Sequence, residues 1–230
     1  MLSQTFKAIN RNRLLYLAIT LVLWLTFVAV NHGANPFVLL VSIPVVLGFQ
    51  FILMGKLLDI EWTQRRHLLS FVVFLLKNLA FFVISFVTVV VVVNVAFLKI
   101  YPFHAAIIGI IAVSTFSLAW IALTAFLGSW MAAGVDGREA SLKAAFLRGR
   151  RPFLRRFFHL LIVTALFTGV SLVPSLLINI QPKGPAWVDA ADLVSLAMQM
   201  GLCAFYAVYM VDQYQEMGAQ HRAEQLVEVF

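Results

Sequence analysis

Long apolar runs separated by short polar turns dominate the chain. An apolar helix needs about 20 residues, at a rise of 1.5 Å per residue, to cross the hydrocarbon core of a bilayer. Six stretches approach or exceed this length, and the segment 31–36, NHGANP, is a strong turn signal between the first two. The predicted spans are about 14–30, 37–58, 75–98, 103–130, 157–178 and 187–211. The pattern predicts an all-α polytopic membrane protein, with six transmembrane helices as three hairpins in a single membrane domain of residues 1–230.

The third and fourth apolar runs, 68–98 and 103–133, are longer than the others. Each has about 31 residues, or roughly 46 Å as a helix, against a hydrocarbon core of about 30 Å. Helices of this length tilt or project beyond the membrane. Basic residues, Arg65 and Arg66, precede the third run. We therefore expect the third run to start at the interface and its span to begin near residue 75.

The polar segment 134–156, between the fourth and fifth spans, predicts a short amphipathic helix. Asp136 and Glu139 have the spacing of a capping box at its start, and Gly149 and Pro152 are typical of its end. We expect about three turns at the membrane surface, followed by a basic turn into the fifth span. The small or apolar residues of its predicted face are Ala140, Ala144 and Leu147.

Composition indicates that lipid is the solvent of this chain. Of its 230 residues, 62% are hydrophobic and only 12% are charged, whereas a soluble domain is about half apolar and a quarter charged. The first apolar run follows basic residues, as in a secretory signal. It is longer than a signal-peptide core, however, and lacks a convincing cleavage motif. We expect it to be a retained membrane helix.

The distribution of Lys and Arg predicts the orientation. With six spans both termini share one side, and 14 of the 17 Lys and Arg residues lie there. The opposite side carries only Lys99 and Lys183, and Lys77 lies within the third run, near enough to the basic side to extend to it. By the positive-inside rule the termini, the insert 134–156 and the tail 212–230 are cytoplasmic.

Residues 130–178 resemble part of a bacterial membrane-protein family. A small-residue segment GREASLKAAF, a basic turn RGRRPFLRRF and a Leu/Val helix that ends near VPS follow one another. This part of the chain is similar to the membrane domain attached to some glycerophosphodiester phosphodiesterases, and to free-standing YciC-type proteins. The resemblance implies an all-helical bacterial inner-membrane protein, in a family mostly without an assigned reaction. The phosphodiesterase catalytic domain has no counterpart here, so its activity is not implied.

Five arginines fall within the segment 148–156, RGRRPFLRR. Basic residues beside a membrane contribute about 1 kcal/mol each near an anionic leaflet, so anionic lipid headgroups or an acidic protein partner are candidate ligands. Alternatively, the cluster only determines topology. Nucleic acid is not expected as a partner, because no nucleic-acid-binding fold accompanies the cluster. The candidate contact residues are Arg148, Arg150, Arg151, Arg155 and Arg156.

Polar residues recur at helical spacing on one face of the fifth span and one face of the sixth. Two such faces on adjacent helices can line a polar pathway or bind a headgroup. Alternatively, these groups hydrogen-bond between the helices, each contributing well below 2 kcal/mol. The candidate pathway residues are Thr164, Thr168, Ser171, Ser175, Ser195 and Gln199, and Asp192, Cys203 and Tyr206 extend the face of the sixth span.

The sequence offers little chemistry for catalysis. No acidic residue lies in the middle of a predicted span, and no HExxH, GxSxG or Walker motif is present. A single cysteine excludes an intrachain disulfide, and no spacing suggests zinc or an iron–sulfur cluster. Histidines near each predicted interface can in principle ligate haem, although interfacial histidines are commonly solvated. We therefore expect no enzyme activity, no metal and no cofactor.

Three functional hypotheses follow. The leading one is a non-enzymatic inner-membrane subunit or scaffold, whose cytoplasmic face contacts a protein partner or a second copy of the chain. The tail 212–230 supports it, because acidic and apolar residues are interspersed there. The alternative is a transporter or lipid-handling protein that uses the polar faces of the fifth and sixth spans. A third is a sensor of membrane state that signals to a cytosolic effector.

Overall fold

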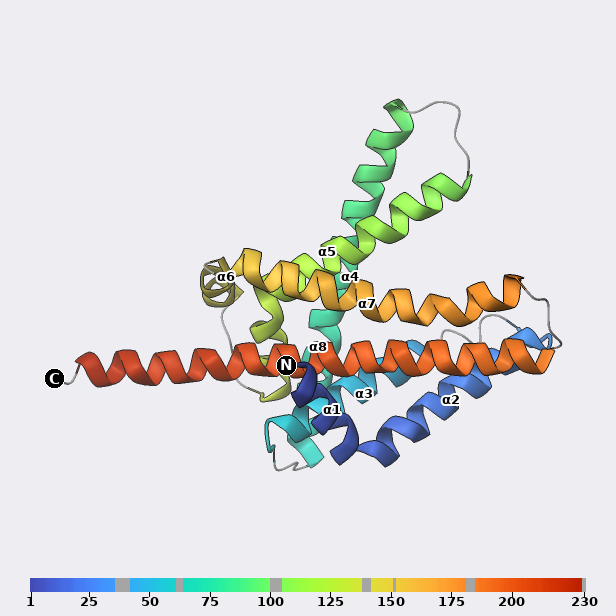
Figure 1. Cartoon of the computed structure of the whole chain (residues 1–230). Helices are drawn as coiled ribbons and strands as arrows, with labels where there is room; N and C mark the ends of the chain where they lie inside the picture. The colour runs from blue at the N-terminus through green and yellow to red at the C-terminus, as the bar shows by residue number, and fades with distance from the viewer. Residues whose placement is uncertain are drawn as a thin grey trace. The chain divides into compact units, whose positions relative to one another are not determined.

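The computed structural model describes residues 1–35, 42–60, 64–99, 105–137, 142–150, 152–180 and 185–228. Every regular element among them is an α-helix, which confirms the predicted all-α class (Figure 1). The chain divides into two compact units. Unit 1 comprises residues 1–61 and 162–216, and unit 2 comprises residues 62–161 and 217–230. The single membrane domain stays a prediction.

Five of the described helices are long and apolar enough to cross a membrane, which indicates a membrane protein. The five candidate spans are Arg13–Asn31 in α2, Leu68–Val95 in α4, Ile107–Val135 in α5, Phe153–Pro174 in α7 and Trp187–Glu216 in α8. Helix α3, Ser42–Leu57, is apolar but has 16 residues, or about 24 Å. The first residues of the predicted second span, 37–41, lie outside the described part of the chain. Six spans therefore remain a prediction.

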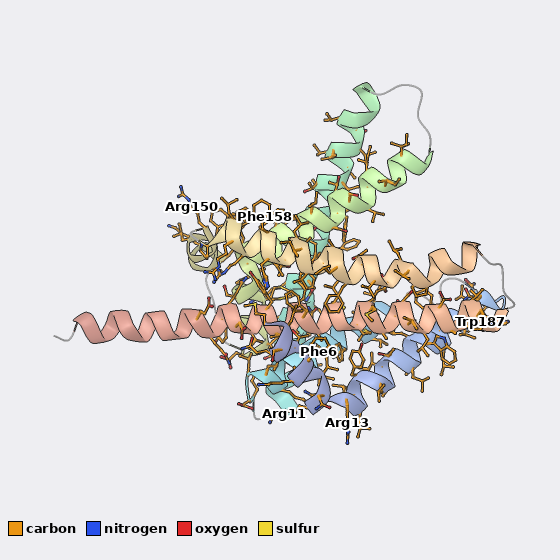
Figure 2. All side chains as sticks on the ribbon, viewed as in Figure 1. Phe6, Arg11, Arg13, Arg150, Phe158 and Trp187 are labelled. Carbon is orange, nitrogen blue, oxygen red and sulfur yellow. The ribbon has the colours of Figure 1, made fainter. Side chains whose placement is uncertain are left out.

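Unit 1 begins with a helix that the apolar pattern does not predict. Helix α1, Leu2–Arg11, precedes α2, Arg13–Asn31, and the two are separated at Asn12. The Asn12 side-chain amide donates to the carbonyl oxygen of Ala8 at 3.0 Å, which gives the end of α1 a local hydrogen bond within its last turn. Phe6 is 64% exposed on α1 (Figure 2). The N-terminal basic residues are therefore divided between two helices.

Helix α2 runs antiparallel to α8, Pro185–Glu228. Near the start of α2 the Tyr16 hydroxyl donates to the carbonyl oxygen of Ala197. Two turns further along, the Trp24 indole nitrogen donates to the carbonyl oxygen of Asp189 at 2.7 Å. Helix α3 also packs on α2, and the rings of Tyr16 and Phe49 meet edge to face, with centroids 6.3 Å apart.

Helix α8 continues well past the predicted end of the sixth span. It has 44 residues, or about 66 Å, against a hydrocarbon core of about 30 Å. The predicted tail 212–230 is therefore helical as far as Glu228, rather than separate from the sixth span. No proline or helix-ending turn signal interrupts the chain between 186 and 228, so the helix continues after the apolar residues end.

In unit 2, α4, Gln64–Lys99, and α5, Ala105–Val135, pack together as a hairpin (Figure 1). The Phe81 ring of α4 contacts two rings of α5, with centroids 5.7 Å from Trp120 and 6.5 Å from Trp130. Helix α4 is continuous from Gln64, and its candidate span by length and composition is Leu68–Val95, so a start near residue 75 stays a prediction. The basic residues thus belong to the first turn of α4 itself.

The predicted helix of the insert is confirmed as α6, Leu142–Arg150, and Leu147 is the residue of its predicted face whose side chain is described. Leu147 is 53% exposed, whereas Ala145 and Gly149 are buried. A Cβ atom on Gly149 would lie 2.9 Å from the Cα atom of Phe126 in α5, and closer still to its carbonyl oxygen. The two backbones therefore touch, and small size rather than hydrophobicity selects the residues at this contact. The remaining predicted face residues are Ala140, outside the described residues, and Ala144, whose side chain is also outside them.

Candidate functional site

The fifth and sixth predicted spans, now α7 (Phe153–Ile180) and α8, run antiparallel in unit 1. The hydroxyls of Thr164 and Tyr206 share a hydrogen bond of 2.9 Å. Closer to the turn between the helices, the Ser195 hydroxyl donates to the carbonyl oxygen of Ser171 at 2.7 Å. The two predicted polar faces therefore do meet, and some of their polar groups form hydrogen bonds between the two helices.

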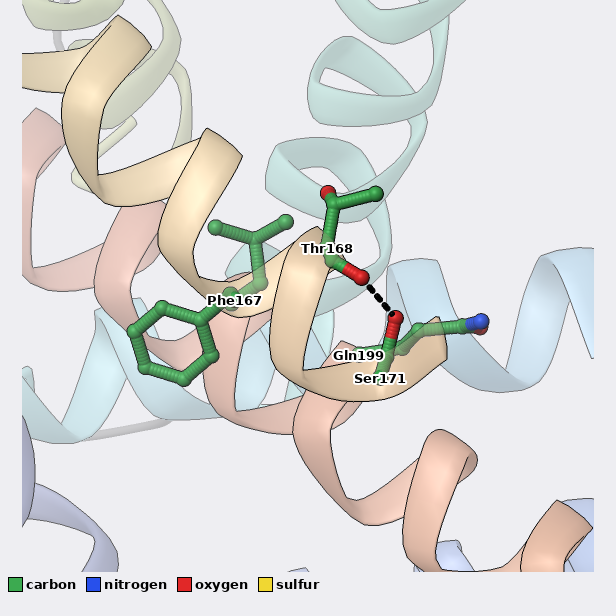
Figure 3. Close-up of a pocket in the computed structure, with 5 residues that line it drawn as sticks. Phe167, Thr168, Ser171 and Gln199 are labelled. Carbon is green, nitrogen blue, oxygen red and sulfur yellow. Dashed lines mark hydrogen bonds between the residues drawn. The ribbon is translucent and has the colours of Figure 1, made fainter. Parts of the chain in front are cut away.

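A cavity of about 210 Å³ lies between these two contacts. Its lining contains three of the predicted pathway residues, and Figure 3 draws the lining side chains and labels Phe167, Thr168, Ser171 and Gln199. Ser171 is only 7% exposed, and its hydroxyl donates to the carbonyl oxygen of Thr168 at 2.8 Å. Thr168 and Gln199 are exposed instead. The residues that line the cavity are Phe167, Thr168, Ser171, Gln199 and Leu202.

The residues that line the cavity lie near the middle of the predicted fifth and sixth spans. Gln199 is 12 residues after Trp187, where the candidate span of α8 begins, or about 18 Å along the helix. Thr168 is six residues before Pro174, where the candidate span of α7 ends, or about 9 Å along the helix. The middles of the predicted spans 157–178 and 187–211 fall near Thr168 and Gln199, so these spans predict both residues near the midplane.

The chemistry of the lining is polar but uncharged. Hydroxyls and one amide supply hydrogen-bond donors and acceptors, and one phenyl ring and one leucine supply apolar contact. The segments 160–180 and 193–211 contain no charged residue. Among the described residues no group of His, Cys, Asp and Glu could hold a metal ion. The arrangement can bind an uncharged polar group, and its lining residues include no activated nucleophile.

The remaining predicted pathway residues do not line the cavity. Thr164 is engaged with Tyr206, Ser195 is engaged with the Ser171 carbonyl, and the side chain of Ser175 lies outside the described part of the structure. Asp192 faces α2 rather than α7, because its carboxylate accepts a hydrogen bond of 2.8 Å from the Asn31 amide. The polar face of the sixth span is thus divided between two neighbouring helices.

Phe167 contributes to the cavity, and the polar pattern gives no indication of it. Its ring lies against Gly201 of α8, where an added Cβ atom would be 2.9 Å from the Phe167 Cε1 atom. The glycine therefore leaves the space that the ring occupies. A glycine within an apolar run is a general signal of close approach, but it does not identify the partner.

The structure describes the side chains of Arg150, Arg155 and Arg156 among the five predicted contact arginines. Arg150 ends α6, Arg155 lies in the first turn of α7, and both are exposed. Arg156 is half-buried. Arg151 and the side chain of Arg148 lie outside the described residues.

Lys77 of α4 is buried, with 8% of its surface exposed. Its ammonium donates to the carbonyl oxygen of Trp130 at 2.6 Å and lies 4.6 Å from the centre of the Trp130 ring. The Lys77 ammonium therefore contacts the C-terminal part of α5, and its extension to the membrane surface stays a prediction.

Comparison with protein families, with curated proteins and with solved structures finds no match for this chain.

Proposed function

We propose that this is a non-enzymatic membrane protein that binds the uncharged polar part of a lipid in the cavity between α7 and α8, and so handles lipid within the bilayer. The cavity carries the proposal, because it joins Thr168, Ser171 and Gln199 in one uncharged polar lining. Exposed polar groups at this depth are costly unless they have a partner. A lipid headgroup that crosses the membrane needs such a partner at the midplane.

The surroundings of the cavity favour a lipid over a water-soluble solute. Three exposed residues of α7 near Thr168 are large and apolar, namely Leu166, Val170 and Leu172. In a membrane, such an apolar surface contacts the acyl chains of lipids. A ligand that reaches Gln199 from this side therefore enters from the bilayer, and a lipid is the class of molecule found there.

The same proposal includes six spans and the orientation that the charges predict. Helix α3 and the adjoining apolar residues 37–41 supply the second span. With six spans, 14 of the 17 Lys and Arg residues lie on the side of the termini, which the positive-inside rule assigns to the cytoplasm. The resemblance of residues 130–178 supports a bacterial inner membrane.

The test is photolabelling of the full chain in vesicles that contain a photoactivatable diacylglycerol. We expect saturable labelling of α7 and α8, competed by unlabelled diacylglycerol. Replacement of Thr168 by Val and Gln199 by Leu removes both exposed polar groups, and each lost hydrogen bond lowers saturable labelling by about threefold. The matched control is Thr88→Val with Asn94→Leu, which removes an exposed hydroxyl and an exposed amide of α4. Equal labelling of the two double variants would contradict the proposal.

A subunit or scaffold role is the second candidate, and the length of α8 favours it. The helix continues to Glu228, 17 residues beyond residue 211, the predicted end of its span. The 12 residues after Glu216, where the candidate span ends, extend about 18 Å beyond the apolar segment. A photo-crosslinking residue placed at Gln225 should capture one protein partner, or a second copy, at stoichiometric yield in a mild-detergent preparation. A full chain that purifies alone, without a crosslink, would exclude this role.

A further inference from the structure

Within unit 2, α6 is held on α5 by contacts that leave its opposite face uncovered by α5. Gly149 touches the backbone of Phe126, and Ala145, one turn earlier, is buried. The Phe126 ring stacks on Phe146 of α6 and on Phe153 of α7, with centroids 5.1 and 3.9 Å apart. These contacts orient α6 about its own axis, and so determine which of its residues face outward.

The outward face of α6 combines large apolar side chains with cations. Lys143 and Arg150 are exposed, and their spacing of seven residues puts them on the same side of the helix. Leu142, Phe146 and Leu147 flank them, and about half of each of these side chains is exposed. A surface that alternates cations with large apolar groups is unsuited to water alone.

The first turns of α7 continue this surface. Leu154 is 65% exposed, Arg155 is exposed, and Phe158 is exposed on the next turn. Figure 2 labels Arg150 and Phe158, whose side chains point outward from the ribbons of α6 and α7. The candidate span of α7 begins at Phe153. Arg150 is therefore three residues before a segment apolar enough to enter the hydrocarbon core, and Arg155 lies in its first turn.

We propose that this surface, formed by Leu142, Lys143, Phe146, Leu147, Arg150, Leu154 and Arg155, binds the phosphate headgroups of anionic phospholipids. The apolar side chains enter the acyl boundary, and the aliphatic stems of the cations follow them while the charged ends contact phosphate. Charge complementarity favours this occupant, because the segment 140–188 contains no Asp or Glu. The surface shares no residue with the cavity of α7 and α8, so the two proposals stand or fall independently.

An acidic protein segment is the other occupant with suitable charge. The exposed leucines and phenylalanines favour the bilayer over an acidic protein segment, since they continue directly into the apolar surface of α7. A bilayer matches both parts of this surface at once, with acyl chains beside the apolar groups and phosphates at the level of the cations.

The experiment uses the full chain with Leu147→Cys as the only cysteine, in a Cys203→Ala background, labelled with bimane. The protein is reconstituted in vesicles that contain brominated phosphatidylglycerol or, at the same mole fraction, brominated phosphatidylcholine. We expect stronger quenching by the anionic lipid. Arg150→Gln with Arg155→Gln should reduce this preference by about fivefold per charge removed, and Arg150→Lys with Arg155→Lys should retain it. The matched control, Lys7→Gln with Arg13→Gln, removes two exposed cations elsewhere and should leave it unchanged.

Three outcomes would overturn the proposal. Equal quenching by the two lipids, with Arg150 and Arg155 both present, shows that the surface contacts lipid without recognising the headgroup. Quenching by neither lipid shows that water or protein covers the surface. A preference for the anionic lipid that survives Arg150→Gln with Arg155→Gln shows that other residues recognise it. Saturable diacylglycerol labelling of α7 and α8 is unaffected by all three, which separates this test from that of the cavity.

Discussion

The ammonium of Lys77 and the carbonyl oxygen of Trp130 form a hydrogen bond of 2.6 Å between α4 and α5. A buried ammonium needs acceptors, and a helix leaves only its last four carbonyl oxygens without an intrahelical partner. Trp130 is five residues before Val135, the end of α5, so its carbonyl accepts this bond in addition to the helix ladder. The π face of Trp130, 4.6 Å away, adds attraction for the same charge.

The first prediction concerns Gly134, which makes room for Lys77. A Cβ atom on Gly134 would lie 2.9 Å from Lys77 Nζ, and all three of its nearest atoms belong to Lys77. We expect Gly134→Ala to lower the free energy of unfolding by about 1–3 kcal/mol, because the ammonium must leave its acceptor. Equilibrium unfolding in mixed detergent micelles measures this change in the free energy of unfolding.

A double-mutant cycle provides the control for this prediction. In a Lys77→Ala background the atoms that crowd the new methyl group are absent, so Gly134→Ala should leave the free energy of unfolding unchanged or raise it by up to about 1 kcal/mol. An equal loss in both backgrounds would show that the glycine serves the backbone rather than the lysine.

Gly149→Ala tests the contact between α6 and α5. The added methyl group would overlap the Phe126 carbonyl oxygen, so one helix must shift. We expect a loss of about 1–3 kcal/mol in the free energy of unfolding and faster proteolysis between α5 and α6. Gly169→Ala in α7 is the matched control, since nothing lies within 4 Å of its added Cβ atom. That substitution should stabilise the helix by about 0.5–1 kcal/mol. If both variants are equally stable, the α5–α6 contact does not form as described.

The hydrogen bond between Thr164 and Tyr206 contributes to packing between α7 and α8. Thr164→Val and Tyr206→Phe each remove one hydroxyl of a 2.9 Å pair. We expect each to cost about 0.5–1 kcal/mol of unfolding free energy, with a coupling energy of about 0.6 kcal/mol from the double variant. A coupling energy of zero would mean that the two hydroxyls do not interact.

Gly201→Ala should alter the cavity with little effect on stability. The new methyl group displaces the edge of the Phe167 ring, which lies 2.9 Å away and lines the cavity. We expect the ring to move into the cavity and saturable diacylglycerol labelling to fall, while the unfolding free energy changes by about 1 kcal/mol or less. Phe167→Leu should restore labelling in the Gly201→Ala background. Gly48→Ala, with nothing near its added Cβ atom, is the control that should leave labelling unchanged.

Much of the candidate site could be predicted because it depends on helical spacing. Thr168 and Ser171 share a face of α7, and a short connection makes the next helix its antiparallel neighbour. In such an antiparallel pair, the part of α8 around Gln199 lies opposite Thr168. Both residues line the cavity. Asp192 shows the limit of this argument, because α8 has α2 as a second neighbour. The Asp192 carboxylate accepts a hydrogen bond from Asn31 of α2 instead of facing α7.

The sequence by itself determined the helical class, the candidate spans and the polar faces, since apolar length and periodicity are local properties of the chain. Only the tertiary structure decided that Lys77 reaches the Trp130 carbonyl, that Gly149 meets the backbone of Phe126 and that Gly201 accommodates Phe167. A backbone acceptor has no sequence signature, and a glycine does not indicate its partner. Both depend on how two helices rotate and approach, which packing between distant residues sets.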